Sequence, residues 1–156
     1  MGWLSRPNRV EHEPPRTGEV VVPLPEHTDA GVYFIGAVHT PWKTRAACPK
    51  RGQQDGPECT IVLDPRWVLA LEGIGQHPRL QILYWMHLSR RDLVKQTPRG
   101  SGITSGTFAI RSPVRPNPIA SSVVTLLGVE GHVLRVRGMD CVDGTPVVDI
   151  KPHRPE

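Results

Sequence analysis

Cysteine is scarce in this chain of 156 residues, and its three copies form no recognisable pattern. Cys48, Cys59 and Cys141 include no Cys-X-X-Cys pair, and their number is odd. A disulfide framework needs an even set of cysteines, and a thiolate zinc site needs closely spaced ones. The sequence therefore predicts neither, and a reducing cytoplasm is the expected compartment.

Long apolar segments are also missing. Residues 1–16 lack the hydrophobic stretch of a secretion signal, and no segment approaches the roughly 20 apolar residues that span a bilayer. The seven histidines show no zinc-ligand spacing, and no Ser-His-Asp set stands out. We therefore expect a cytoplasmic protein with no membrane segment and no metal.

Residues that interrupt regular structure are, in contrast, abundant. The chain has 15 glycines and 17 prolines, which favour short strands joined by turns over long helices. Its length suits a single hydrophobic core. The 19 Lys and Arg against 15 Asp and Glu give a net charge of +4, which is compatible with a polyanionic partner without requiring one.

The first thirty residues differ from the rest in composition. They contain five prolines, many charges and a single apolar run at 20–22. We interpret residues 1–30 as a proline-rich arm that is either disordered or packed as an edge strand, where proline is tolerated. Residues 31–156 then form the folded domain.

Seven segments of that domain have the apolar and β-branched character of strands. They are residues 32–39, 60–63, 80–87, 106–110, 122–129, 133–137 and 145–150. A helix is predicted over 65–72, because Asp64 suits an N-cap, Pro65 suits the first helical position and Gly73 suits the end. Short strands with one or two short helices predict an all-β fold, a small antiparallel barrel of about seven strands, since closure removes exposed edges.

The densest motif is a proline-rich loop at 106–119. Its prolines alternate with Arg115 and Asn117, fix the backbone and remove hydrogen-bond donors, so the loop should be rigid and should present its polar side chains. A crossover merely stiffened by proline would show the same pattern. A rigid loop that carries Arg111 and Arg115 also suits a phosphate or a carboxylate.

RSPVRPNPI at 111–119, followed by DCVDGTPVVDIKP at 140–152, resembles the signature pair of the TsaA/TrmO family of tRNA methyltransferases. IGAVHTPWK at 35–43 and LYWMH at 83–87 are similar to the family's opening and central strands. The resemblance implies a small β-barrel enzyme, usually a homodimer. Such an enzyme uses S-adenosyl-L-methionine to methylate the exocyclic N6 amine of threonylcarbamoyladenosine beside the tRNA anticodon.

The same resemblance implies a cofactor site assembled from five segments. Its predicted contacts are Pro49, Lys50, Arg51, His87, Leu88, Arg111, Val123, Asp140, Cys141, Val142 and Asp143. Asp140 and Asp143 suit the cation, the ribose hydroxyls or the adenine amine of S-adenosyl-L-methionine, whereas Arg111 or Lys50 suits its carboxylate. Taken alone, Asp143 would more often be a turn residue, and His87 a core or rim histidine.

Contacts to the tRNA anticodon loop are predicted for Arg115 and Asn117, helped by the surface residues Arg90, Arg91 and Arg99, because phosphates attract positive charge. No catalytic base is predicted, because proximity supplies most of the acceleration of an in-line methyl transfer.

Two other functions remain open. One is a non-catalytic RNA-binding barrel, although such a surface should avoid the carboxylates of Asp140 and Asp143, which repel phosphate. The other is a methyltransferase for a different nucleoside or small molecule. It is suggested by the divergence from the family pattern at residues 75–79 and at Ala120, where glycine is common.

Overall fold

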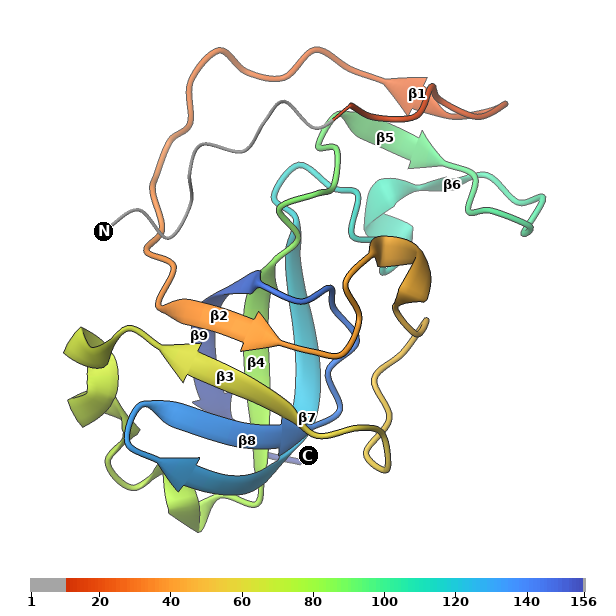
Figure 1. Cartoon of the computed structure of the whole chain (residues 1–156). Coiled ribbons are helices and arrows are strands. Elements are labelled where there is room, and N and C mark those ends of the chain that lie inside the picture. The colour runs from red at the N-terminus through yellow and green to blue at the C-terminus, as the bar shows by residue number, and fades with distance from the viewer. Residues whose placement is uncertain (1–10, 156) are drawn as a thin grey trace. The chain divides into compact units, whose positions relative to one another are not determined.

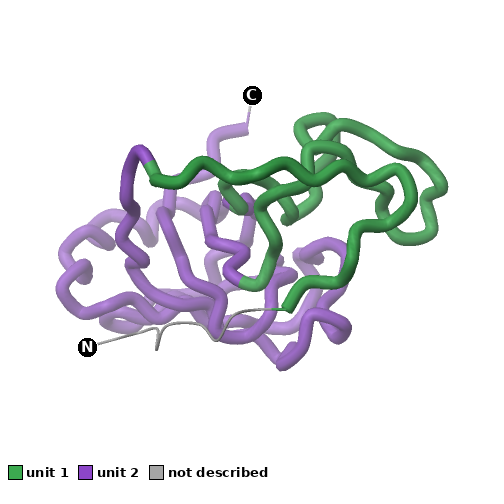
Figure 2. Tube along the Cα trace, turned by 90° about the horizontal axis from the view of Figure 1, so that it is seen from above, with its two compact units in different colours: residues 1–28, 88–118 green, residues 29–87, 119–156 purple. Residues whose placement is uncertain are grey.

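The computed structural model describes residues 11–155. The chain divides into two compact units, each made of two separate stretches of sequence (Figure 2). The barrel unit comprises residues 29–87 and 119–156, and the accessory unit comprises residues 1–28 and 88–118. Residues 1–10 of the predicted arm lie outside the part of the chain that the structure describes.

The barrel unit is a closed six-stranded barrel in which every neighbouring pair of strands is antiparallel (Figure 1). Around the barrel, the strands follow the order β2 (Gly36–His39), β3 (Cys59–Leu63), β8 (Val133–Arg137), β7 (Ile119–Glu130), β4 (Arg79–Trp85) and β9 (Thr145–Pro152). The predicted small antiparallel barrel is therefore confirmed, with six strands in the closed sheet.

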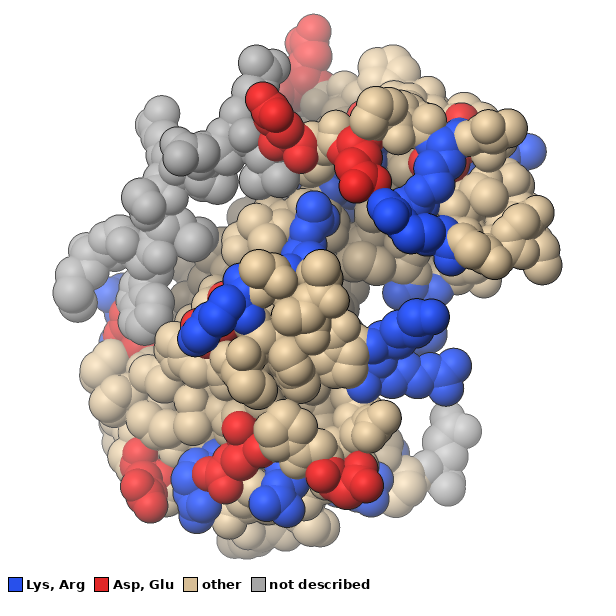
Figure 3. All heavy atoms as spheres, turned by 45° about the vertical axis from the view of Figure 1, so that its right-hand side comes forward, with Lys and Arg blue, Asp and Glu red and all other residues tan. Residues whose placement is uncertain are grey.

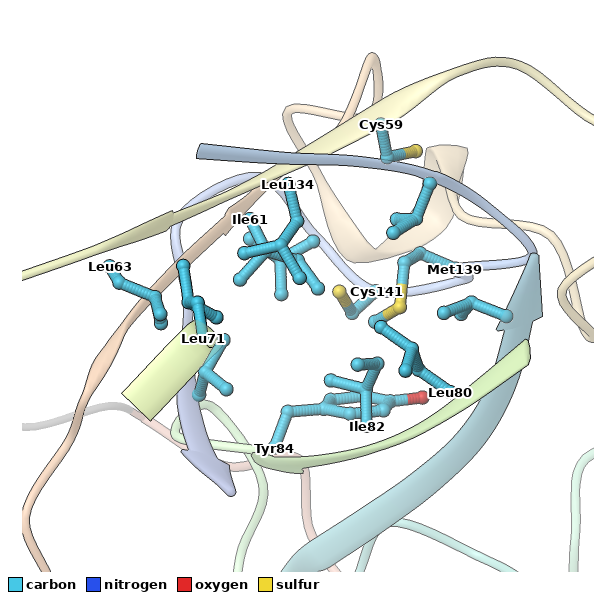
Figure 4. Close-up of a cluster of buried hydrophobic side chains, with 14 residues drawn as sticks. Cys59, Ile61, Leu63, Leu71, Leu80, Ile82, Tyr84, Leu134, Met139 and Cys141 are labelled. Atoms are coloured by element: carbon cyan, nitrogen blue, oxygen red, sulfur yellow. The ribbon is translucent and has the colours of Figure 1, made fainter. Parts of the chain in front are cut away.

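The core of the barrel comes from alternate residues of its strands, since successive side chains of a strand point to opposite faces. In β4, Leu80, Ile82 and Tyr84 are buried, and in β8, Leu134 and Val136 are buried. Figure 4 shows these side chains gathered inside the barrel with Met139 and Cys141. The strand predicted over 133–137 is confirmed as β8, in which Arg135 and Arg137 alternate with the buried residues.

Two predicted strands differ from the structure. The segment 32–39 is paired as a strand only from Gly36 onward, because Tyr33 leaves the sheet, is 80% exposed and lies against Trp67 with ring centroids 6.4 Å apart. The segment 106–110 is not a strand. Instead, β6 (Ser105–Gly106) ends where the 3₁₀-helix η4 (Thr107–Ala109) begins, and Phe108 is left 82% exposed.

The predicted helix is present but is a 3₁₀-helix, η2 (Pro65–Leu71). The Asp64 side chain accepts from the Arg66 N–H, and Gly73 follows with a φ of 84° that glycine adopts without strain. Two shorter 3₁₀-helices, η1 (Arg45–Ala47) and η3 (Ile74–Gln76), complete the barrel unit. Within residues 11–155, no helix has the length and apolar character to cross a bilayer.

The accessory unit contains a three-stranded antiparallel sheet in the order β1 (Val20–Val21), β5 (Leu93–Gln96) and β6. Its small interior is organised by polar contacts. The buried Gln96 amide donates to Thr107 Oγ1 and to the Val114 carbonyl at 2.7 Å each, and Thr107 Oγ1 donates to the Leu93 carbonyl at 2.6 Å. Gln96 thus joins the sheet to the proline-rich loop within this unit.

Candidate functional site

The turn between β8 and β9, residues 138–144, leaves its two carboxylates, Asp140 and Asp143, half-buried next to buried residues of the same turn. Met139 and Cys141 are 2% and 1% exposed and point into the core. Burial raises the pKa of the Cys141 thiol to about 12, so it stays protonated at neutral pH. The side chains of Cys141 and Val142 are buried, and the cofactor contacts predicted for these two residues stay predictions.

The carboxylate of Asp140 is held by a chain of hydroxyl groups. The Tyr84 hydroxyl donates to Asp140 Oδ1 at 2.7 Å and lies 2.7 Å from Ser122 Oγ. Burial, and then the charge of Asp140, raise the pKa of Tyr84, so its single proton is available for Asp140. Ser122 must therefore donate to Tyr84. No described residue donates to the other oxygen, Oδ2, which keeps its capacity to accept from a ligand.

Asp143 is more fully engaged within the barrel. Its Oδ1 accepts from the Thr40 N–H at 3.0 Å and lies 3.2 Å from His39 Nδ1, while Oδ2 lies 2.7 Å from Lys43 Nζ. The Asp143 N–H also donates to the Trp42 carbonyl. The Lys43 ammonium is the main reason that the pKa of Asp143 is lowered. These contacts hold the turn against the end of β2, so Asp143 has the structural role of an aspartate in a turn.

The long loop between β2 and β3 brings Lys50 and Arg51 to the surface, where both are exposed. The segment that follows is anchored. The Gln54 amide donates to the Val123 carbonyl at 2.8 Å, and Thr125 Oγ1 donates to Gln54 Oε1 at 2.6 Å. Gly52 of the same loop lies against the backbone of Gly138, so the structure joins three predicted cofactor segments within the barrel unit: the loop of Pro49 to Arg51, Val123 on β7, and the 138–144 turn.

His87 is the last residue of the first stretch of the barrel unit, residues 29–87. Its N–H donates to the Trp85 carbonyl at 2.9 Å. Burial lowers the pKa of His87, which favours the neutral imidazole near pH 7. Leu88, the next predicted contact, begins the second stretch of the accessory unit.

The predicted tRNA contacts Arg115 and Asn117 belong to the accessory unit, as does Arg111. Arg115 Nη1 donates to the carbonyls of Ile110 and Ser112 at 3.0 and 2.9 Å and so stiffens its own loop. Asn117 Oδ1 accepts from Arg91 Nη2 at 3.2 Å. The loop has neither helix nor strand over 111–118, as predicted, and the binding roles of these residues stay predictions.

Some of the basic residues predicted to meet RNA are paired with acidic ones. Arg90 binds Asp92 through two nitrogens at 2.7 and 3.1 Å, and Arg99 lies 2.9 Å from Glu13. Acidic and basic side chains also lie next to each other along the lower edge of the view in Figure 3. An electrostatic attraction for RNA would depend on the basic residues that have no such partner.

No sequence motif indicated Tyr84, Ser122, Gln54 or Gly52 as part of the candidate site. Tyr84 reads as a core aromatic of a buried strand. The one available signal was chemical, since a buried tyrosine hydroxyl needs a hydrogen-bond partner. For Gln54, which lies in a loop without periodicity, no pattern pointed to its role.

Comparison with known proteins places these features in a family. Residues 37–156 match the family model described as the tRNA-methyltransferase O N-terminal domain. A protein of Rhizobium radiobacter named "Probable S-adenosyl-L-methionine-binding protein VirR" is 49% identical over 139 residues, which are 89% of this chain and 79% of that protein. The tRNA (adenine(37)-N6)-methyltransferase of Escherichia coli K12 is 34% identical over 132 residues, covering 78% of this chain and 56% of the enzyme.

Solved structures give the same result. A crystal structure of TrmO is 35% identical, with a TM-score of 0.69, over 82% of this chain and 59% of that one. TrmO from Pseudomonas aeruginosa is 34% identical, with a TM-score of 0.68, over 82% of this chain and 57% of that one. The chain therefore spans somewhat more than half the length of these TrmO proteins.

Proposed function

The chain belongs to the family of the tRNA-methyltransferase O N-terminal domain, and on this premise we propose that it is an S-adenosyl-L-methionine-dependent tRNA methyltransferase. Its acceptor is the exocyclic N6 amine of threonylcarbamoyladenosine beside the anticodon, in keeping with the adenine-37 N6 activity named for the Escherichia coli relative. The structural observation that carries the proposal is the Asp140 carboxylate, held through Oδ1 by Tyr84 while Oδ2 keeps its accepting capacity.

The groups of the barrel unit fit the cofactor. S-adenosyl-L-methionine, when bound, supplies an electrophilic methyl group on a sulfonium, together with an ammonium, a carboxylate and ribose hydroxyls. Asp140 is the acceptor for a cationic or hydroxyl group, and the exposed Lys50 is a partner for a carboxylate. Arg111 remains the alternative partner proposed for that carboxylate.

Each residue of the site has a distinct task in this proposal. Tyr84 and Ser122 hold Asp140 in one orientation, so little ordering is required when a ligand binds. Asp143 holds the turn that carries Asp140. No side chain is assigned as a base, because alignment of the acceptor amine with the methyl carbon provides most of the acceleration.

We further propose that Arg115 and Asn117 contact the anticodon loop, that the working form is a homodimer, and that the protein acts in the cytoplasm where tRNA is modified. A homodimer would be checked by light scattering of the full chain at micromolar concentration.

The decisive experiment has two stages. Calorimetric titration of the full chain with S-adenosyl-L-methionine tests cofactor binding, and mass spectrometry of nucleosides from tRNA incubated with both tests methylation. Binding followed by methylated threonylcarbamoyladenosine supports the proposal. Binding without that product favours a different nucleoside or small molecule as the acceptor, and absence of binding favours a non-catalytic RNA-binding barrel.

A further inference from the structure

The loop between β2 and β3 is attached to the rest of the barrel unit at Gly52 and Gln54, just after Lys50 and Arg51. Lys50 and Arg51 have exposed side chains, whereas Gly52 lies against the backbone of Gly138 at the end of β8. Asp143 holds the start of the loop at Thr40 and Lys43, and from there to β3 the only regular element is the three-residue helix η1. The attachment at Gly52 and Gln54 therefore sets where Lys50 and Arg51 are held.

The contact between Gly52 and Gly138 leaves no room for a side chain. A Cβ atom on Gly52 would lie only 1.7 Å from the Gly138 carbonyl oxygen. Gly138 itself has a φ of 116°, and a Cβ there would lie 2.8 Å from Gln54 Nε2 and 3.1 Å from the Val123 carbonyl oxygen. Gly52 requires glycine because the neighbouring backbone cannot move away cheaply, and Gly138 requires it because a φ of 116° is strained for any other residue.

The Gln54 amide fills the space beside this contact with both of its ends engaged. Nε2 donates to the Val123 carbonyl at 2.8 Å, and Oε1 accepts from Thr125 Oγ1 at 2.6 Å. Only one orientation of the amide satisfies both partners. The Val123 carbonyl needs a donor, which is Nε2, and the Thr125 hydroxyl can donate to Oε1. The paired register of β7 with β8 begins at Thr125 and Arg137, so Gln54 binds β7 where β8 ends and Gly138 turns away.

We infer that Gln54 is a positioning residue that holds three segments of the cofactor site together: residues 49–51, β7 at Val123, and the turn that begins at Gly138 and carries Asp140. We call the two hydrogen bonds of the Gln54 amide the clasp, and residues 49–51 the basic loop. The expected effect on cofactor binding rests on the proposed function, whereas the hydrogen bonds of Gln54 are a property of the barrel unit alone. Without its two hydrogen bonds, the segment that carries Lys50 and Arg51 is held less firmly, and the fraction of molecules with this segment in place, which binds the cofactor, falls.

Three variants of the full chain test the clasp. Gln54→Ala removes both hydrogen bonds, and Thr125→Val removes one of them while keeping the shape of a strand residue. Gln53→Ala is the matched control, because the Gln53 contact is made by its backbone carbonyl. The readouts are the Kd for S-adenosyl-L-methionine, the unfolding midpoint, and the rate of tryptic cleavage after Lys50 and Arg51, measured by mass spectrometry of the fragments.

If the clasp holds the loop in place, Gln54→Ala should raise the Kd about tenfold, as expected when about a tenth of the molecules keep the loop in position. Thr125→Val should raise it less, and both should be cleaved faster at Lys50 and Arg51 while their unfolding midpoints stay close to that of the parent. Gln53→Ala should match the parent in all three measurements. A residue that served stability alone would lower the midpoint and leave the Kd of the folded protein unchanged.

The inference is overturned if the parent binds the cofactor while Gln54→Ala and Thr125→Val keep its Kd and its cleavage rate. If Gln54→Ala does not fold, Thr125→Val decides. If the parent does not bind the cofactor, the proposed function fails, and the cleavage rates alone then support or overturn the clasp.

Discussion

The hydroxyl of Tyr84 lies 2.7 Å from Asp140 Oδ1, and this contact joins the buried strand β4 to the turn after β8. Tyr84 is a core residue by burial, yet its polar end reaches a carboxylate outside the core. Ser122 on β7 completes the chain of donors. The position of the Asp140 charge is thus set by two strands of the barrel and not by a flexible loop.

Replacing Asp140 with asparagine should weaken S-adenosyl-L-methionine binding about 10- to 100-fold, the usual cost of losing a hydrogen bond to a charged group. Isothermal titration calorimetry measures the change. Asp149→Asn is the control, because Asp149 is also half-buried in the barrel unit but pairs with Lys151 on its own strand. If both variants lose the same affinity for S-adenosyl-L-methionine, the cause is the change in net charge and not a contact made by Asp140.

Tyr84→Phe should lower the free energy of unfolding by about 1–2 kcal/mol, because it leaves Asp140 and Ser122 without their shared partner while keeping the ring in the core. Urea denaturation of this variant, of Ser122→Ala and of the double variant gives the coupling between the two hydroxyls. Strictly additive losses would contradict a connected chain from Ser122 to Asp140.

Lys43→Met should reduce stability at neutral pH by about 0.5–1 kcal/mol, because the lysine is exposed and solvent screens its charge. The pKa of Asp143 is lowered in the folded state, chiefly by Lys43. This contribution is therefore complete above the unfolded pKa of about 3.9 and is lost as the pH falls through the folded value. The difference between parent and variant in urea unfolding should shrink from pH 7 to pH 3, and a constant difference would argue against the ion pair.

His87 should make stability fall on mild acidification. Burial lowers its folded-state pKa, so the unfolded chain binds a proton first as the pH drops below about 6.5, and unfolding becomes easier. His87→Gln should therefore show a smaller loss of unfolding free energy between pH 7.5 and pH 5.5 than the parent. His27→Gln, at an exposed position, is the control. If His87→Gln loses as much unfolding free energy on acidification as the parent, a group other than His87 causes the loss.

Arg111→Ala tests the predicted cofactor role of the proline-rich loop. We expect S-adenosyl-L-methionine to bind about tenfold or more weakly if the guanidinium pairs with its carboxylate. Arg66→Ala, in which an exposed arginine beside Asp64 on η2 is removed, serves as the comparison. Unchanged binding in Arg111→Ala would remove this residue from the cofactor site.

The sequence predicted the barrel well where the pattern of burial is simple. In β8, Leu134 and Val136 alternate with arginines, and the predicted bounds 133–137 are those of the strand. Prediction was wrong where tertiary contacts replaced strand pairing, as at Tyr33, which lies against Trp67. The short strand β5 was missed because Leu93–Gln96 has little apolar character, and its register comes from pairing with β1 and β6.

For the candidate site, motifs located the segments but not the contacts within them. Asp140 and Asp143 lie in one turn and read as equivalent carboxylates, yet Asp143 has several donors around it, while Asp140 has Tyr84. This difference depends on which strand ends lie beside each residue in the closed barrel. Residue spacing in a single sequence does not contain that information.

Trp85 and Ile119 are register partners on adjacent strands, although thirty-odd residues of chain separate them. The polypeptide therefore leaves the barrel and rejoins it at the two sides of one pair in the β4–β7 ladder. Because the two ends of this stretch lie opposite each other on paired strands, the register of β4 with β7 does not depend on how long the stretch is.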